Sequence, residues 1–521
     1  MTLFSSLQKK LEKVPQSLWV GGIYFLSHLL FMTKLPVFAD EAIYIRWAQL
    51  IQDDAPRYFF FSMADGKPPL FIWFLSLILY PFQDPLFAGR LLAVFIGFVQ
   101  VLVVGRIVAL FTKKKSIPLI GMILCTFLPF WFFYDRMALM DGLLTLLLSL
   151  AFLFSLRLVR SPAQRKGNLQ FTIYNFQVWD ILGLAFSFGG ALMTKTPALF
   201  AIPIIAIVPF LFYEKKFDRK KTIRAIVPIG IGGFVGCLVF LTLRISPLFG
   251  ALFARSSDFT FSIHDVIGGE WKYILFTSTW KNLWWIVYYL SPPSILLLIV
   301  GLCSKQRKNI VSLLVCAFLF FVPLTVLGRV LYPRYFLPSA LFVTVALSLC
   351  FEGLTKRTIK WSIVMLSSLC IGMHSLYFIG TSFFDIAHIP FVPADSVQYL
   401  EEWSAGFGNK EVENYVRTLA IANPQKHYVV LTEGSFGTLP DGILMYFHGS
   451  TSLPNVEIHG IGVDQSSIPS EYVALARTEE VFYMVNSHRF KIAKLESISK
   501  IFEVDRPNSA PTLQLYKVTG L

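Results

Sequence analysis

The sequence predicts a polytopic α-helical membrane protein with a small α/β domain at its carboxyl end, and three observations support this expectation. Of the 521 residues, 55% are hydrophobic and 15% are charged, against roughly 45–50% and about 25% in soluble domains. The apolar residues form continuous runs long enough to cross a bilayer, without the alternation typical of an outer-membrane barrel. The basic residues gather in short clusters between those runs, which indicates membrane topology and not nucleic-acid binding.

Six basic clusters give the expected topology. They are Lys9/Lys10/Lys13, Lys113/Lys114/Lys115, Arg157/Arg160/Arg165/Lys166, Lys215/Lys216/Arg219/Lys220/Lys221/Arg224, Lys305/Arg307/Lys308 and Lys356/Arg357/Lys360. If each cluster marks the cytoplasm, every interval between neighbouring clusters contains an even number of crossings. The apolar runs satisfy this rule with about eleven crossings, at residues 17–35, 86–111, 117–134, 138–156, 178–194, 197–213, 225–245, 282–303, 310–328, 335–351 and 361–380. We therefore expect a plasma-membrane protein with a cytoplasmic amino terminus, and with everything after about residue 381 outside.

One apolar run does not fit this count. Residues 68–80 are too short for a comfortable crossing, and counting them as one would place Lys113/Lys114/Lys115 outside. We expect a re-entrant or interfacial helix that belongs to the first outer loop, at about residues 37–83.

The last part of the chain differs in character from the rest. From about residue 395 onward it carries Gly, Asn and Asp turn signals and β-like runs at residues 428–431 and 481–485, after a helical pattern at residues 409–420. It has none of the six cysteines, so it needs no disulfide. We predict a membrane domain at residues 1–394 and a separately folded extracytoplasmic α/β domain at residues 395–521.

An acidic pair, Asp40–Glu41, opens an amphipathic stretch that runs to Ile51 and is expected to be helical. One interpretation is structural, with Asp40 as the N-cap of that helix. The other is functional: a carboxylate at the membrane surface, kept ionised by the helix N-terminus, accepts a proton as a general base. The residues by themselves leave both interpretations open.

Charged side chains are also expected in several of the outer loops. They are Lys67 in the first loop, Arg136 and Asp141 in the second, Lys195 in the third and Arg334 in the fifth. Each could be an interfacial anchor or a snorkelling side chain. Their convergence on one face favours a binding site for an anionic substrate such as a phosphate.

The sequence does not indicate a metal or a cofactor. His264 and Asp265 lack a second ligand pair with suitable spacing. The Gly434-Ser435-Phe436-Gly437 turn lacks the lysine of a P-loop. Metal dependence therefore stays open.

Five segments, in chain order, resemble the motif series of membrane glycosyltransferases of the GT-C fold. They are Asp40-Glu41-Ala42, Gly66-Lys67-Pro68-Pro69, residues 136–141, Thr194-Lys195-Thr196-Pro197 and Arg334-Tyr335-Phe336-Leu337-Pro338. The resemblance covers about residues 17–350 and is closest to the superfamily of protein O-mannosyltransferases and lipid A aminoarabinose transferases. It departs at Gly66, where the aminoarabinose transferases have a glutamate.

The resemblance implies an inverting glycosyltransferase that moves a hexosyl or pentosyl group from a polyprenyl-phosphate donor at the extracytoplasmic face. It implies catalytic roles for Asp40 and Glu41 and donor-phosphate contacts for Lys67 and Arg334. Arg136, Asp141 and Lys195 complete the expected donor site. The acceptor hydroxyl is expected on a lipid, a glycan or a protein.

Two other classes of function compete with this expectation. A transporter or flippase of lipid-linked glycans would share a groove for a lipid phosphate but would need no base. Charges at mid-span or an inverted repeat would favour it, and the sequence shows neither. A membrane-anchored binding module, with the carboxyl-terminal part as its working element, is the third class.

Overall fold

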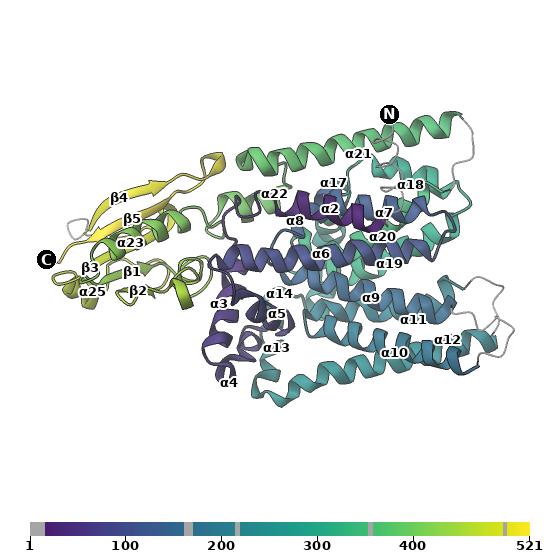
Figure 1. The fold of residues 1–521 in the computed structure, drawn as a ribbon, viewed down its shortest axis with the longest axis horizontal. Coiled ribbons are helices and arrows are strands. Elements are labelled where there is room, and N and C mark those ends of the chain that lie inside the picture. Colours follow the sequence, from purple (N-terminus) through teal and green to yellow (C-terminus); the bar gives the residue numbers. More distant parts are fainter. Residues whose placement is uncertain (1–15, 161–169, 214–218, 353–357, 493–497, 521) are drawn as a thin grey trace, which may run out of the picture. The chain divides into compact units, whose positions relative to one another are not determined.

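The computed structural model describes residues 16–160, 170–213, 219–352, 358–492 and 498–520 (Figure 1). Within these ranges, six helices are long and apolar enough to cross a membrane, and a bent helix pair makes a seventh candidate. Three of the six are the whole helices α6 (Pro85–Ala109), α9 (Met140–Arg160) and α19 (Arg307–Leu327). The other three are Ala225–Ile245, which begins within α12 (Arg219–Leu241), Pro333–Cys350, which contains α20 (Leu337–Cys350), and Trp361–Phe384 in α21 (Thr358–Phe384). The chain is therefore a mostly helical, multi-pass membrane protein.

The remaining apolar helices of the described residues are shorter. They are Leu18–Leu29 in α2 (Gln16–Leu29), α5 (Leu70–Leu79), α7 (Ser116–Phe127), Gln177–Leu192 in α10 (Gln170–Leu192), and Thr196–Leu211, which ends with α11 (Ile202–Leu211). The helix α5 covers ten residues of the apolar run at residues 68–80. Its assignment to a re-entrant or interfacial segment stays a prediction. The count of eleven stays a prediction, because the structure shows six or seven long spans in the described residues. The total reaches eleven only if α2, α7, α10 and α11 cross as well.

One expected crossing, at residues 282–303, is wrong as a continuous helix. The structure divides it into α17 (Thr279–Tyr289) and α18 (Ser294–Leu302), and the two helical parts are bent by 94°. Ser291 has φ +72°, and Pro292 and Pro293 follow it. A left-handed residue before two prolines cannot continue an α-helix, because proline lacks the backbone N–H and restricts the residue before it.

The helix α20 is the core of the membrane helices. It packs against α7, α9, α18 and α19. Of the apolar segment Pro333–Cys350, which contains α20, 89% is buried inside the protein. Its sequence is mostly apolar, and the hydroxyls of Ser339, Thr344 and Ser348 donate to backbone carbonyls, as expected for a helix that is surrounded by other helices.

Short helical elements fill the loops. Those that carry candidate residues are α3 (Ala39–Asp53), α4 (Ala55–Tyr58), η1 (Phe61–Asp65), α8 (Pro129–Tyr134), η2 (Thr196–Ala201), α13 (Ala251–Ala254) and η7 (Pro333–Phe336). The amphipathic stretch after Asp40 is helical as expected, and it forms α3.

The carboxyl-terminal part contains a five-stranded sheet with the order β2-β1-β3-β5-β4. The strands are β1 (Tyr428–Thr432), β2 (Val456–Gly460), β3 (Glu480–Asn486), β4 (Ile498–Val504) and β5 (Leu513–Val518). β1 is parallel to β2 and β3, whereas β5 is antiparallel to β3 and β4. One apolar cluster joins one face of the sheet to α23 (Asn409–Ala422), and another joins the other face to α25 (Ser470–Leu475). The expected small α/β fold, its first helix and its two expected strands are confirmed.

The chain forms two compact units. The first consists of Met1–Leu30, Phe60–Phe71 and Ala93–Ile379, and the second of Phe31–Phe59, Ile72–Leu92 and Gly380–Leu521. The second unit thus combines the sheet with α3 and with the start of α6. Separate folding of residues 395–521 stays a prediction. The basic residues at positions 9–13, 165–166, 215–216 and 356–357 lie outside the described residues.

Candidate functional site

Asp40 lies in the first turn of α3, where it is partly exposed. The expectation that it is the N-cap is wrong, because α3 begins at Ala39 and Phe38 is the N-cap residue. The helix begins earlier than expected because Glu41 Oε2 accepts the backbone N–H of Phe38 at 3.0 Å. Asp40 therefore has the position in the first turn that stabilises an ionised carboxylate.

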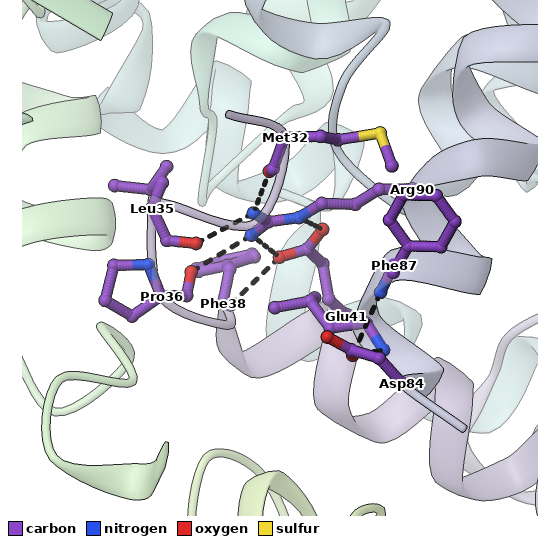
Figure 2. Close-up of polar contacts among 9 residues, drawn as sticks. Met32, Leu35, Pro36, Phe38, Glu41, Asp84, Phe87 and Arg90 are labelled. Atoms are coloured by element: carbon purple, nitrogen blue, oxygen red, sulfur yellow. Dashed lines mark hydrogen bonds and ion pairs between the residues drawn. The ribbon is translucent and has the colours of Figure 1, made fainter. Parts of the chain in front are cut away.

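Glu41 is completely buried and forms a bidentate ion pair with Arg90 of α6 (Figure 2). Arg90 Nε donates to Glu41 Oε1 at 2.8 Å, and Nη2 donates to Oε2 at 2.7 Å. Arg90 also donates to the carbonyls of Met32, Leu35 and Pro36, at 2.8, 2.8 and 3.0 Å. All five N–H groups of the guanidinium thus donate hydrogen bonds. Through Arg90, the loop before α3 and the first turn of α3, which carries Asp40, are both bonded to α6.

The carboxyl-terminal part of the chain contacts the same helix within the second unit. Ala39 N donates to Ser404 O at 3.0 Å, and Gly406 N donates to Val37 O at 2.9 Å. Farther along α3, Gln49 Nε2 donates to Met445 O at 2.8 Å. These bonds connect the position of Asp40 to the fold of the α/β part.

Lys67 lies in a small group of charges in the first unit. Its ammonium pairs with Asp65, whose other carboxylate oxygen accepts from Arg255. Gly66 between them has φ +73°, a left-handed conformation that costs glycine little. The turn at Gly66 brings Asp65 and Lys67 to the same side, so this glycine has a backbone role.

Asp141, Lys195 and Arg334 meet although they are far apart in the sequence. Lys195 Nζ donates to Asp141 Oδ1 at 2.7 Å, and Arg334 Nε lies 3.8 Å from Asp141 Oδ2. Asp141 opens α9, Lys195 precedes η2 and Arg334 lies in η7, so three segments supply one cluster. Lys195 also lies 4.0 Å from the ring centroid of Tyr335. Asp141 and Arg334 are buried.

The cluster places two cations next to one carboxylate. Lys195 and Arg334 both lie close to Asp141, and the ring of Tyr335 lies beside both cations. Such a group is suited to an anion with several oxygens, because charge-assisted hydrogen bonds to phosphate are strong where water is excluded.

Arg136 is buried near the end of α2. Its Nη2 donates to Leu30 O at 2.7 Å, and its guanidinium carbon lies 4.8 Å from the ring centroid of Phe132. The neighbouring Asp135 accepts from the Tyr24 hydroxyl at 3.2 Å. These contacts fix the loop between α8 and α9, which leads directly to Asp141.

Sequence reasoning missed Arg90, Asp65 and Arg255 as parts of these groups. Arg90 lies in an expected crossing, and a lone arginine in an apolar run is itself a signal of a buried partner. Asp265 accepts from Ser262 N at 2.9 Å and caps a short turn, which agrees with the structural interpretation of the His264–Asp265 pair. Among the described residues, no group of three or more His, Cys, Asp or Glu side chains is placed to hold a metal ion.

Comparisons with known proteins place the chain among membrane glycosyltransferase folds. Residues 66–245 match the model of a family described as dolichyl-phosphate-mannose-protein mannosyltransferase. ArnT from Cupriavidus metallidurans in the apo state has a similar structure, with a TM-score of 0.59 at 10% identity over 96% of this chain and 97% of that chain. The same protein bound to undecaprenyl phosphate gives 0.55 at 12% identity, over 96% and 97%. No curated protein sequence matches significantly. The chain therefore has the GT-C fold over nearly its whole length.

Proposed function

We propose that this protein is an inverting glycosyltransferase that moves a sugar from a polyprenyl-phosphate donor to an acceptor hydroxyl. The observation that carries the proposal is the Asp141–Lys195–Arg334 cluster, a largely buried group that brings two cations together at the ends of apolar helices. Two findings support it: the family match over residues 66–245, and the fold shared with a protein whose structure contains undecaprenyl phosphate. Such a donor has an apolar tail for the helices and a phosphate for the cations.

In the proposed reaction, the acceptor hydroxyl loses its proton to Asp40 and its oxygen attacks the anomeric carbon. The bond between that carbon and the phosphate oxygen breaks, and the polyprenyl phosphate leaves as an anion. Lys195 and Arg334, with Lys67 and Arg136 as further donor contacts, stabilise the charge that grows on the leaving oxygen. Asp141 orients the two cations of its cluster.

The structure favours a positioning role for Glu41 within this proposal. Its carboxylate is fully enclosed and both of its oxygens accept from Arg90. An acid or base must reach the reacting proton, whereas an enclosed ion pair fixes backbone. We therefore assign Asp40 to the chemistry and Glu41 to the placement of α3.

The proposed acceptor is a glycan, a lipid or a protein that the carboxyl-terminal part helps to select. Trp403 lies directly before the segment that bonds to α3, and it is 37% exposed. The Arg489 guanidinium carbon lies 4.8 Å from its ring centroid. An exposed indole beside a cation is able to stack on a sugar ring and to hydrogen-bond its hydroxyls, which favours a glycan among the three.

We place the reaction on the extracytoplasmic side of the plasma membrane, with a cytoplasmic amino terminus. The parity of the basic clusters supports this orientation. Labelling single cysteines in intact cells with an impermeant reagent tests it: labelling at position 466 and protection at position 114 are expected, and the reverse pattern would overturn it.

The decisive experiment uses the purified full-length protein and radiolabelled polyprenyl-phosphate hexoses and pentoses, with a membrane extract as the source of acceptor. We expect release of free polyprenyl phosphate with one donor class, and loss of that release in Asp40→Asn. A flippase would move the intact donor across proteoliposomes without cleaving it, and Asp40→Asn would not affect that movement. Metal dependence is measured in the same assay by adding EDTA.

A further inference from the structure

An apolar groove lies between α7 and α21 in the first unit. It encloses about 310 Å³, and its lining includes Ile123 and Phe127 of α7 and Ile371 and Leu376 of α21. Ser368, which also lines it, donates its hydroxyl to Val364 O at 2.7 Å. The groove therefore presents an almost entirely apolar surface, which suits a hydrocarbon chain.

The groove is accessible from the bilayer because α21 is mostly uncovered. Of an 18-residue apolar stretch of α21, only 28% is buried inside the protein. Leu376 on this helix is 70% exposed. Gly372 forms part of the lining, and a Cβ added there would meet nothing within 4 Å. A chain that enters sideways from the lipid is thus met by open space at this glycine.

One end of the groove is positively charged. Phe351 lines it, and Lys114 Nζ donates to the carbonyl of the next residue, Glu352, at 3.2 Å. Lys113 and Lys115 are exposed beside Lys114, directly before α7. The Glu352 carboxylate accepts from Gln306 Nε2 at 2.6 Å. Three lysines and one carboxylate leave a net positive charge at this end.

This end of the groove is distant from the proposed donor cluster. Arg160, at the end of α9, donates to the carbonyl of Leu110, which lies just before the three lysines. Asp141 is at the other end of the same helix. At 1.5 Å per residue, the two ends are roughly 28 Å apart, about the thickness of a hydrocarbon core.

We propose that this groove binds an anionic glycerophospholipid, with one acyl chain between α7 and α21 and its phosphate at Lys113, Lys114 and Lys115. Basic pockets between membrane helices bind anionic headgroups by this combination of charge and apolar surface. The headgroup lies in the leaflet opposite to the donor cluster, so the bound lipid is not the sugar donor. The lipid fills the space between α21 and its neighbour and joins the two helices.

The test measures binding of fluorescent phosphatidylglycerol to the purified full-length protein in detergent by fluorescence anisotropy. Phosphatidylcholine with the same acyl chains is the neutral comparison. We expect phosphatidylglycerol to bind more tightly than phosphatidylcholine. The double variant Lys113→Gln with Lys115→Gln should weaken the binding of phosphatidylglycerol and leave the binding of phosphatidylcholine unchanged. The expected loss of affinity is about fivefold per lysine, as for one juxtamembrane cation.

A second variant tests the groove itself. Gly372→Leu should fill the groove and lower the affinity for both lipids at least tenfold. The control is Gly230→Leu on α12, where an added Cβ also meets nothing within 4 Å, and it should leave the affinity unchanged. Unchanged binding in Gly372→Leu, or equal affinity for both lipids with no effect of the lysines, would overturn the proposal. Unlabelled undecaprenyl phosphate and unlabelled phosphatidylglycerol are then compared as competitors of the fluorescent lipid. If undecaprenyl phosphate displaces the fluorescent lipid at the lower concentration, the groove belongs to the sugar donor and the proposal is overturned.

Discussion

Removing the Arg90 guanidinium should unfold the segment that carries Asp40 before it affects the rest of the protein. In Arg90→Met, the Glu41 carboxylate, which is 0% exposed, loses its counter-ion and two charge-assisted hydrogen bonds. The carbonyls of Met32, Leu35 and Pro36 lose their donors as well. Breaking one side of a buried ion pair costs about 3–5 kcal/mol, so the cost falls on residues 31–41.

Hydrogen exchange followed by mass spectrometry measures this local cost. Amides in residues 31–41 should exchange about 10²–10³-fold faster in Arg90→Met, which corresponds to the lower part of that free-energy range. The sheet of the carboxyl-terminal part should change much less. Transfer activity should fall together with protection, because Asp40, the proposed base, is no longer held in place.

A double-mutant cycle separates the ion pair from packing. Replacing both partners, Glu41→Leu with Arg90→Met, should recover part of the protection, since no buried charge then lacks a partner. The recovery should be incomplete because the three carbonyls still lack their donors. Glu41→Leu by itself should lower protection as Arg90→Met does. The reasoning would be refuted if Arg90→Met left exchange at residues 31–41 unchanged. A double variant with restored protection and full activity would also exclude Glu41 from catalysis.

Three further predictions concern the chemistry and the pH response. Asp40→Asn should reduce turnover by about 10²–10⁴-fold with little change in donor binding. Normal turnover by the well-folded variant would reject Asp40 as the base. Lys195→Ala should raise the KM for the donor about tenfold or more, as expected for one lost hydrogen bond to a charged group. Lys195→Arg should retain part of the affinity for the donor. An unchanged KM in Lys195→Ala would contradict the assignment of Lys195 to the donor site. Burial raises the pKa of Asp441 to about 6, against the opposing effect of the Gly437 N–H. Because the folded state then binds the proton more tightly, this carboxyl should lower stability as pH rises from about 4 to about 6. The thermal midpoint of Asp441→Asn should not show that decrease, and identical pH profiles would disprove the assignment.

The membrane helices and the α/β part were accessible from the sequence because each depends on local pattern. Apolar length identifies α6, α9 and α19, and the alternation of turns and β-like runs identifies β1 and β3. The break between α17 and α18 also had a signal in the sequence, since Ser291 precedes two prolines. We predicted one continuous crossing there because the residues on both sides of the break are apolar. Hydropathy records composition along the run and does not record a change of direction.

The candidate site was predictable only in part, for a physical reason. Asp141, Lys195 and Arg334 each lie at the end of an apolar run, so their common depth in the membrane follows from topology. Their contact does not, because it depends on how three segments pack. Arg90 was missed for the same reason: its partner Glu41 is 49 residues away, and no periodicity links an ion pair between two helices.

The position of Asp40 depends on both ends of the chain. The segment from Met32 to Phe38 is fixed by Arg90 and Glu41, and α3 is also bonded to the carboxyl-terminal part through Ser404 and Met445. A carboxylate that must meet an acceptor hydroxyl within hydrogen-bond distance needs such constraints, because a displacement of about 1 Å is able to cost a hundredfold in rate. Under the proposed function, the α/β part has two separable roles: Trp403 would contact the acceptor, and the bonds to α3 hold the helix on which the proposed base lies. A variant that removes only the indole should change acceptor preference, whereas one that weakens the backbone bonds at Ala39 should lower turnover for every acceptor.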